Sequence, residues 1–471
     1  MANLPVYFEQ RRVGAIDVDK NGPRFSYDPD WIALRGAFPI SVTMPFRSER
    51  IASDIFLPWA ANLLPESEQL RTLGQILGMA RSDVIGLLSA IGGDTAGALS
   101  IGQPGRTASV QWRPIGKSDD LERVMNELPN KPFLVGDEGV SMSLAGVQTK
   151  LAVAVDDAGR ICIPMNGSPS THILKPDSAR LRGSVQNEAF CLTLARRLKI
   201  PTPNITTGRA GKRTYLLLQR YDRTVVGGRW RRLHQEDYCQ ALGKPPSAKY
   251  ESYQTGIPGP TLNDMFDVTR RHMPPTDIVR LLDMVVFNIL ACNTDAHAKN
   301  YSIIIRGNGV SLAPMYDVMC GEVWENVSKN LAHKIAGKNR GDYLKGRDWQ
   351  LFARECGLNP RQVVERVSTL AASAIAEAGA AECEVAGMPA GEHPILNQTR
   401  QAVERRAHLL LEQLQEIGEG PVIDAATTAG IFRMKRYRAP GDLKRHMHSD
   451  QKHREATTAQ QSTSLGHPGP K

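Results

Sequence analysis

The 471-residue sequence has few cysteines and no cysteine motif. No two of its cysteines form a C-x-x-C pair; they stand singly at Cys162, Cys191, Cys239, Cys292, Cys320, Cys356 and Cys383. An odd number of scattered cysteines argues against a disulfide framework and against a zinc site. We therefore expect reduced, buried thiols in a cytoplasmic protein.

Long apolar runs are also absent. No stretch reaches the roughly 20 apolar residues that a membrane-spanning helix needs. The first residues, MANLPVYFEQRRVGAI, contain no apolar core of a secretory signal. The sequence thus predicts a protein without a membrane partner.

The positive charge is unevenly distributed. The formal net charge is +9, and nine Lys or Arg against three acidic residues follow Gly430, so this end supplies six of the nine charges. A basic segment that also reads TTAQQSTSLGHPGPK cannot build a core, and we expect a disordered tail over 421–471. Its charge would favour contact with nucleic acid, but a solvated tail is the favoured interpretation.

Length and local texture predict several domains. Residues 1–102 look like a small α+β unit, with a hairpin around DKNGP followed by helices and a closing strand. Residues 103–138 are polar and proline-rich and look like a connector with one helix near Leu121–Leu128. Residues 139–225 predict a strand-rich sheet with one helix, and 226–420 are mainly helical.

Within the helical part, PPTDIVRLLDMVVFNILACN is the clearest helix. Thr276 is its expected N-cap, and apolar residues recur at helical spacing along one face. YSIII and VSLAPMYD then predict two strands joined by the turn RGNG, which places Asp317 in the second strand.

Between that helix and those strands lies NTDAHAKN, which carries a chemical signal. Asp295 and Asn300 have the D-x-x-x-x-N spacing with which polypeptide kinases place a proton-accepting Asp and a magnesium-binding Asn. Asp317 follows where a kinase keeps its second magnesium ligand. Lys175, on the strand HILKPD, stands where a kinase keeps its phosphate-binding lysine, and Glu188 in the next helix could pair with it. This order, with the sheet before the helices, is that of a two-lobed kinase.

Each residue taken singly has a simpler explanation. Lys175 and Glu188 would form an ordinary ion pair, Asp317 would cap a turn, and His297 would be a hydrogen-bonded core histidine. Their joint order along the chain is what favours a kinase.

One feature of ordinary protein kinases is missing. No G-x-G-x-x-G loop precedes the lysine strand; the sequence there is MSLAGVQTKLAV, with the single glycine Gly146. One glycine still lets a turn approach a phosphate closely, and backbone N–H groups together with Lys150 could bind it.

Several segments, in order, resemble the HipA family of bacterial toxin kinases: SLAGVQTKLAV, THILKPD, NEAFCLTLARRL, LLLQRYDR, RLHQEDYCQALG, NTDAHAKNYSI and LAPMYDV. Residues 4–102, with NLLPE and IGGDTAGAL, resemble the family's N-terminal domain, and the resemblance extends to about Leu414. It implies an α+β, two-lobed protein-kinase-like fold with an N-terminal α+β subdomain. It also implies an ATP- and magnesium-dependent serine/threonine kinase that arrests growth as the toxin of a type II toxin–antitoxin system.

The resemblance assigns roles to individual residues. Asp295 would be the catalytic base, Asn300 and Asp317 the magnesium ligands, and Glu188 the ion-pair partner of Lys175. The nucleotide would contact the phosphate loop, Lys175, the hinge and the loop after the catalytic base, which together comprise Ala145, Gly146, Val147, Gln148, Thr149, Lys150, Lys175, Gln219, Arg220, Tyr221, His297, Ala298, Lys299 and Asn300.

Ser143 matches the autophosphorylated serine of the family. A phosphate there would add about −1.5 to −2 charge beside the phosphate loop and could expel it, which would silence the enzyme. Thr149 stands where the best-known member has an acid, so the loop can behave differently here.

The resemblance also implies partners. They are a HipB-like helix-turn-helix antitoxin, operator DNA reached through that antitoxin, and an aminoacyl-tRNA synthetase as substrate, glutamyl-tRNA synthetase being the familiar one. Two other functions stay open. A catalytically weak corepressor is disfavoured by the complete kinase set, and a small-molecule kinase of the aminoglycoside type by the Ser143 motif and the N-terminal domain.

Overall fold

The N-terminal part is a four-stranded antiparallel sheet in the order β3-β2-β1-β4 with helices packed on it. The computed structural model describes residues 2–105, 109–252 and 256–415. Asp19 pairs with Gly22 across the turn between β2 and β3, which confirms the hairpin around DKNGP. The residues before it form a second hairpin. The elements are β1 (Ala2–Phe8), β2 (Arg11–Asp19), β3 (Gly22–Tyr27), α1 (Pro29–Ile32), α2 (Ser53–Ala61), α3 (Ser67–Leu77), α4 (Val84–Ile91) and β4 (Leu99–Ile101).

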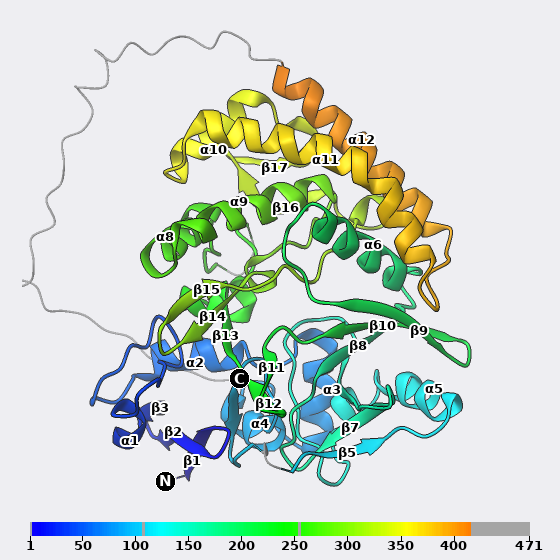
Figure 1. Ribbon diagram of the computed structural model, residues 1–471. Helices are drawn as coiled ribbons and strands as arrows, with labels where there is room; N and C mark the ends of the chain where they lie inside the picture. The colour runs from blue at the N-terminus through cyan, green and yellow to red at the C-terminus, as the bar shows by residue number, and fades with distance from the viewer. Residues whose placement is uncertain (1, 106–108, 253–255, 416–471) are drawn as a thin grey trace, which may run out of the picture. The chain divides into compact units, whose positions relative to one another are not determined.

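A six-stranded antiparallel sheet follows, in the order β5-β7-β6-β8-β10-β9. Its helix α6 lies between the sheet and the C-terminal helices α11 and α12 (Figure 1). The elements are β5 (Gln111–Pro114), α5 (Ser118–Glu127), β6 (Leu151–Val155), β7 (Ile161–Met165), β8 (His172–Pro176), α6 (Ser184–Arg197), β9 (Ile205–Ala210) and β10 (Arg213–Gln219), with a 3-10 turn at Pro132–Leu134.

The segment predicted as a connector contributes to this sheet. β5 pairs with β7 at the sheet edge, and the Trp112 indole donates to the Pro169 carbonyl at 3.1 Å. The buried face of α5, with Leu121 and Met125, joins the core under the sheet. The polar, proline-rich composition hid this strand because an edge strand needs only one pairing neighbour and can expose most of its side chains.

The remaining residues form the helical lobe and several short strands; the long helices of the lobe are drawn in the upper half of Figure 1. Helices are confirmed from Gly346 to Gln415. The elements are β11 (Arg223–Val226), β12 (Arg229–Arg232), β13 (His234–Asp237), α7 (Tyr238–Ala241), α8 (Leu262–His272), α9 (Pro275–Leu290), β14 (Ser302–Arg306), β15 (Gly309–Leu312), β16 (Asn330–Ile335), β17 (Lys338–Arg340), α10 (Gly346–Glu355), α11 (Pro360–Ala386) and α12 (Ile395–Gln415), with 3-10 turns at Pro246–Ala248, Ala298–Asn300, Gly321–Val323 and Gly341–Tyr343.

Two local predictions are wrong. Thr276 is not the N-cap of α9; Pro274 is, and Pro275 occupies the first helical position, where its missing N–H costs nothing. Asp317 is not in a strand, because β15 ends at Leu312 before Pro314, which has no N–H to donate to a ladder. Asp317 instead has a φ of +59°, in the left-handed region that Asp tolerates better than most residues.

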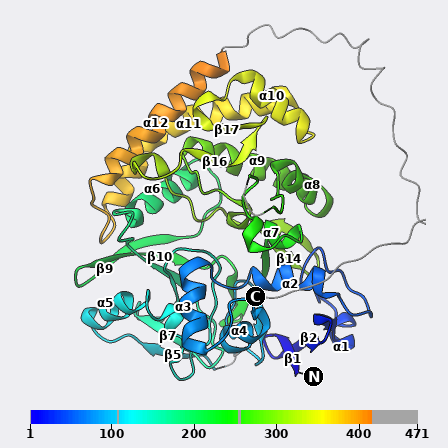
Figure 2. The same cartoon turned by 180° about the vertical axis from the view of Figure 1, so that it is seen from behind.

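A buried ionic cluster joins the N-terminal unit to the end of β10. Asp94 accepts hydrogen bonds from Arg223 at 2.8 Å, Arg232 at 3.2 Å and the Ser170 hydroxyl at 2.6 Å, and lies 3.6 Å from Arg220. Burial opposes ionisation, but the three guanidinium groups outweigh it and lower the pKa of Asp94. Seen from behind, the helices α2, α3 and α4 of the N-terminal unit lie below α8, α9 and α11 (Figure 2).

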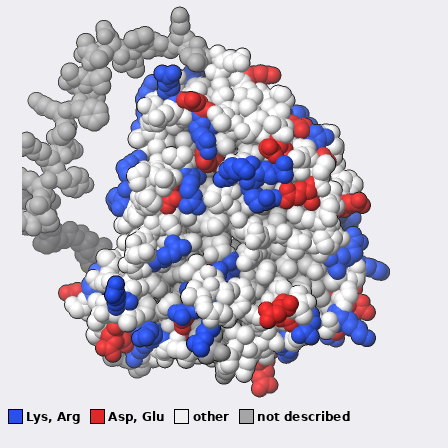
Figure 3. All heavy atoms as spheres, in the orientation of Figure 1, with Lys and Arg blue, Asp and Glu red and all other residues white. Residues whose placement is uncertain are grey.

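The surface charge and the helices of the described residues bear on the kinds of partner expected. Lys and Arg are interspersed with Asp and Glu over the face in Figure 3, so this face has no continuous basic surface. None of the described helices is long and apolar enough to cross a membrane. The basic tail predicted for 421–471 lies outside the described residues.

The buried carboxyl of Glu236 makes stability depend on pH. One oxygen accepts the Val42 N–H at 2.9 Å, and the other has no partner among the described atoms. Burial raises the pKa of Glu236 to about 8. Between pH 5 and 8 the folded chain therefore holds a proton that the unfolded chain has released, so the free energy of unfolding falls as the pH rises.

We expect Glu236→Gln to remove this slope. At pH 8.5 the variant should exceed the parent in free energy of unfolding by as much as ~4 kcal/mol, with little difference at pH 5. Urea unfolding at both pH values measures it, with the exposed Glu127→Gln as the matched control. A variant whose pH slope equals that of the parent would contradict the assignment.

Candidate active site

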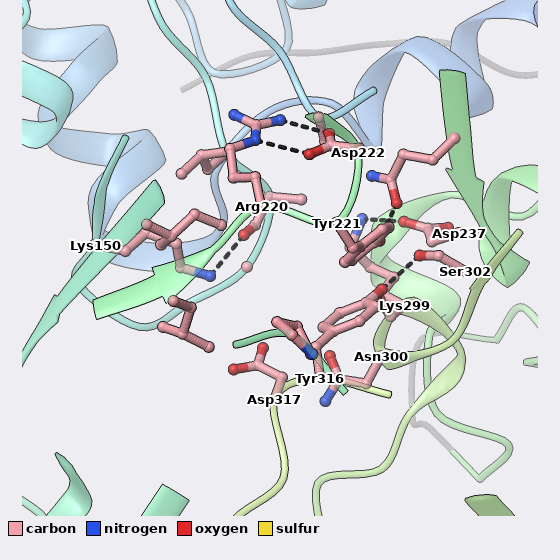
Figure 4. Close-up of a pocket in the computed structure, with 18 of the residues that line it drawn as sticks. Lys150, Arg220, Tyr221, Asp222, Asp237, Lys299, Asn300, Ser302, Tyr316 and Asp317 are labelled. Atoms are coloured by element: carbon pink, nitrogen blue, oxygen red, sulfur yellow. Dashed lines mark hydrogen bonds and ion pairs between the residues drawn. The ribbon is translucent and has the colours of Figure 1, made fainter. Parts of the chain in front are cut away.

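A cavity lies between the six-stranded sheet and the helical lobe, with part of its wall supplied by the N-terminal unit (Figure 4). Its volume, open solvent at its mouth included, is about 910 Å³. The predicted residues that line it come from segments far apart in the sequence, and they are Ala145, Gly146, Lys150, Lys175, Gln219, Arg220, Tyr221, His297, Lys299, Asn300 and Asp317.

Lys175 is the centre of a buried charge triad. Its ammonium donates to Glu188 Oε1 at 2.6 Å and to Asp317 Oδ1, so the predicted pairing with Glu188 is confirmed. Burial acts against the ammonium, but Asp317 and Glu188 outweigh it and raise the pKa of Lys175. Burial raises the pKa of Glu188, whereas Lys175 and Lys150 outweigh burial and lower the pKa of Asp317. Asp317 is thus the partner held firmly as an anion.

Asp295 is held by its own loop but is not in the wall of this cavity. Its carbonyl accepts the His297 N–H at 2.8 Å and Asn300 Nδ2 at 2.7 Å. Its carboxylate accepts the Tyr250 hydroxyl, and 59% of its side chain is exposed. Loss of surrounding water raises the pKa of Asp295, with the charges of Asp317 and Glu66 acting in the same direction. A raised pKa suits a carboxylate that accepts a proton.

The D-x-x-x-x-N spacing places Asn300 in the cavity wall. Because Asn300 uses Nδ2 on the Asp295 carbonyl, its Oδ1 is the amide atom left to accept or to bind a cation. Burial, with Lys249 and Lys299 nearby, lowers the pKa of His297 well below its usual value, so the ring is neutral at pH 7. His297 Nδ1 has no partner among the described atoms.

The other members of that loop have structural contacts. The Lys299 ammonium donates to Asn62 Oδ1 at 2.7 Å and to Asp237 Oδ2 at 2.9 Å, which ties the loop to the N-terminal unit. Ala298 is buried and does not line the cavity. These two residues hold the loop in place, and Lys299 has little freedom to reach a ligand.

The predicted phosphate loop enters the cavity only at its ends. Gly146 has a φ of +106°, a backbone conformation that residues with a side chain rarely adopt, and a Cβ there would come within 2.8 Å of Lys150 Nζ, so the lysine would have to shift. Lys150 Nζ donates to the Ala145 carbonyl at 2.8 Å. The intervening residues Val147, Gln148 and Thr149 do not line the cavity.

The N-terminal unit holds this loop. The Glu66 N–H donates to the Gly146 carbonyl at 3.2 Å, and Gln69 Nε2 donates to the Val147 carbonyl at 2.9 Å. Ser143 is fully buried, and its hydroxyl donates to the Leu63 carbonyl at 2.6 Å. In this conformation Ser143 is inaccessible, so its phosphorylation would require the loop to leave.

The hinge segment is fixed from behind. The Arg220 guanidinium donates to both oxygens of Asp222, at 2.8 and 2.6 Å, so a contribution of Arg220 to nucleotide binding would come from its main chain. The Tyr221 ring stacks on Tyr316, with centroids 5.5 Å apart (Figure 4). Tyr221 therefore offers a flat, rigid apolar wall at the place where a nucleotide base is expected.

The sequence did not reveal the wall residues from the N-terminal unit. Asn62, Leu63 and Ala96 line the cavity together with Tyr316 and Asp237. No spacing signal could have found Asn62, Leu63 and Ala96, because these residues precede the lysine strand by many positions and reach the cavity only through the tertiary fold. Within the described ranges, no group of three or more His, Cys, Asp or Glu side chains could hold a metal ion.

Comparisons with known proteins point to one family. The family model of the HipA-like C-terminal domain matches residues 142–378, and that of the HipA N-terminal domain matches residues 4–102. The Sinorhizobium fredii protein Y4mE is 35% identical over 378 residues, which is 78% of this chain and 89% of Y4mE.

Two matches, one to a sequence and one to a solved structure, are to HipA of Shewanella oneidensis. Its serine/threonine-protein kinase toxin HipA is 31% identical over 347 residues, or 70% of this chain and 78% of the toxin. The solved structure of a Shewanella oneidensis HipA with HipB and operator DNA superposes with a TM-score of 0.77 at 25% identity, covering 88% of this chain and 99% of that one. These matches confirm the predicted two-lobed α+β fold, and the chain belongs to the HipA family of serine/threonine-protein kinases.

Proposed function

We propose that this chain transfers the γ-phosphoryl group of ATP, with magnesium, to a serine or threonine hydroxyl of another protein. The observation that carries the proposal is the buried triad of Lys175, Glu188 and Asp317, which faces Asn300 across one cavity and lies near Asp295. Burying a lysine between two carboxylates costs desolvation free energy. Such a charged cluster beside a cavity therefore indicates a functional site rather than an ion pair that only stabilises the fold.

Each residue of the site has a distinct role in this proposal. Asp295 accepts the proton of the attacking hydroxyl, and Lys175 neutralises phosphate charge. Asn300 and Asp317 would hold the magnesium ion, since magnesium takes few protein oxygens and keeps water and phosphate in its other positions. Bound there, the metal would screen charge on the phosphates. Tyr221 and Tyr316 support the base of the nucleotide. Gly146, which has no side chain, leaves room beside Lys150 for the phosphates.

Control of activity is proposed through Ser143. Its hydroxyl sits under the phosphate loop, against the Leu63 carbonyl. A phosphate at this buried position could not be accommodated without desolvating about two negative charges, so the loop would be displaced and nucleotide binding lost.

Partners follow from the family. We propose that a HipB-like helix-turn-helix antitoxin binds this chain and brings it to operator DNA, and that the chain is the toxin of this pair. An aminoacyl-tRNA synthetase, glutamyl-tRNA synthetase in the first place, is the proposed substrate.

Induced expression tests the toxin function. We expect the parent chain to arrest growth, Asp295→Asn to permit it, and co-expression of the antitoxin to restore it. If parent and variant arrest growth equally, the toxicity is not phosphoryl transfer. If neither arrests growth and both bind the antitoxin on DNA, the chain is a corepressor.

A further inference from the structure

A second cavity, of about 1140 Å³ with open solvent at its mouth included, lies beside the catalytic loop and is separate from the nucleotide cavity. No described residue lines both. Asp295 stands at the boundary: its side chain is in the wall of the second cavity, and Asn300, bonded to its carbonyl, is in the wall of the first. The exposure of Asp295 therefore faces this second space.

The walls of the second cavity are mostly apolar. Met319, Trp324, Val327 and Leu331 contribute from the helical lobe, and Leu181 contributes from the segment between β8 and α6. Among the described residues that line it, Asp295 is the only one with a charged side chain. A ligand here meets mainly apolar surface with one carboxylate in the wall.

The wall is held in a defined position. The Trp324 indole donates to the Arg182 carbonyl at 3.3 Å, which ties the two lobes together at the rim. Lys329 Nζ donates to the carbonyls of Gly321 and Glu322 at 3.1 and 3.2 Å. A preformed apolar surface binds without an ordering cost, so it can select a partner.

We propose that this cavity binds the acceptor segment of the protein substrate and selects an apolar side chain directly next to the acceptor serine or threonine. The inference rests on the proposed kinase function. The walls match an apolar neighbour, because burying its side chain against apolar surface is favourable. An acidic neighbour is disfavoured, because its charge would be desolvated beside Asp295.

The placement suits the chemistry. The acceptor oxygen attacks the γ-phosphorus from the side away from the leaving group. As the new oxygen–phosphorus bond forms, the hydroxyl proton passes to the Asp295 carboxylate, and the bond from the γ-phosphorus to the β–γ bridging oxygen breaks, which leaves ADP. An acceptor held in the second cavity reaches Asp295 without entering the space of the nucleotide.

The experiment fills the cavity with charge. Val327→Arg places a guanidinium in the wall, and Ser328→Arg does so at a more exposed lining position, in case the first variant folds poorly. Val279→Arg is the matched control, because Val279 is 51% exposed and lines neither cavity. The substrate probe is a bacterial lysate whose own kinases have been blocked with an irreversible ATP-site reagent that is then removed.

We expect the parent and Val279→Arg to phosphorylate the same lysate sites, and both cavity variants to do so at least tenfold more slowly with MgATP affinity within twofold of the parent. The main site should have an apolar residue directly beside the phosphorylated residue. Changing that residue to Glu in the purified substrate should lower the rate at least tenfold, and changing it to another apolar residue should not.

Several outcomes would overturn the inference while leaving the kinase function intact. They are unchanged lysate phosphorylation by both cavity variants, a main site with an acidic neighbour, or a parent that phosphorylates Ser143 and no lysate protein. Failure of the kinase function itself looks different: the parent then binds no MgATP and phosphorylates nothing.

Discussion

Asp295→Asn should lower the rate of phosphoryl transfer by about 10²–10⁴-fold, which is the usual contribution of a positioned proton acceptor. The amide keeps an oxygen for the Tyr250 hydroxyl, and the loop is held by main-chain contacts, so folding should be unaffected. The carboxylate is outside the nucleotide cavity, so MgATP affinity should stay within a few-fold. Single-turnover phosphorylation and nucleotide titration measure the two quantities.

The matched control is Asp157→Asn, at an exposed loop position between β6 and β7. It should transfer phosphate at the parent rate. An Asp295→Asn variant that kept more than about a tenth of the parent rate would show that proton acceptance by this carboxylate is not part of the mechanism.

Lys175→Met should lower the free energy of unfolding by about 3–5 kcal/mol, since it leaves the buried Glu188 and the half-buried Asp317 without their shared cation. It should also weaken MgATP binding, because a phosphate-neutralising charge is lost. Urea unfolding at pH 7 gives the stability. The exposed Lys212→Met, on the turn between β9 and β10, is the matched control and should change stability by less than about 0.5 kcal/mol.

A second substitution separates charge from packing. In the double variant Lys175→Met with Glu188→Gln, one of the two uncompensated carboxylates is gone, so part of the lost stability should return. If the double variant were less stable than Lys175→Met by the full cost of Glu188→Gln alone, the loss would come from packing, and the triad would not be the electrostatic unit described above.

The sequence by itself determined the order of the site residues along the chain. Asp295 and Asn300 had to share one loop, because they are five residues apart between a helix and a strand. Helical periodicity and an alternating strand pattern located α9 and β14 on either side of that loop. The family resemblance added Ser143 and the phosphate loop, which spacing alone would not have identified.

Local patterns failed where a tertiary contact or a backbone exception decided the outcome. The edge strand β5 was missed because its pairing partner β7 lies beyond another strand in the sequence. The chain leaves strand β15 before Pro314. Asp317 then adopts a left-handed backbone conformation, which brings its carboxylate to Lys175. Thr276 lost the N-cap to Pro274, since Pro275 already suits the first position of α9.

Only the tertiary structure decided which residues face the nucleotide and which face the substrate. Lys299 and Arg220 match nucleotide-binding positions in the sequence, but their charges are taken by Asp237 and Asp222. Leu63 and Glu66 hold the phosphate loop from a distant part of the chain. Sequence spacing fixes local neighbours, whereas burial and charge pairing depend on long-range packing, so the second cavity beside Asp295 became visible only once the two lobes were placed together.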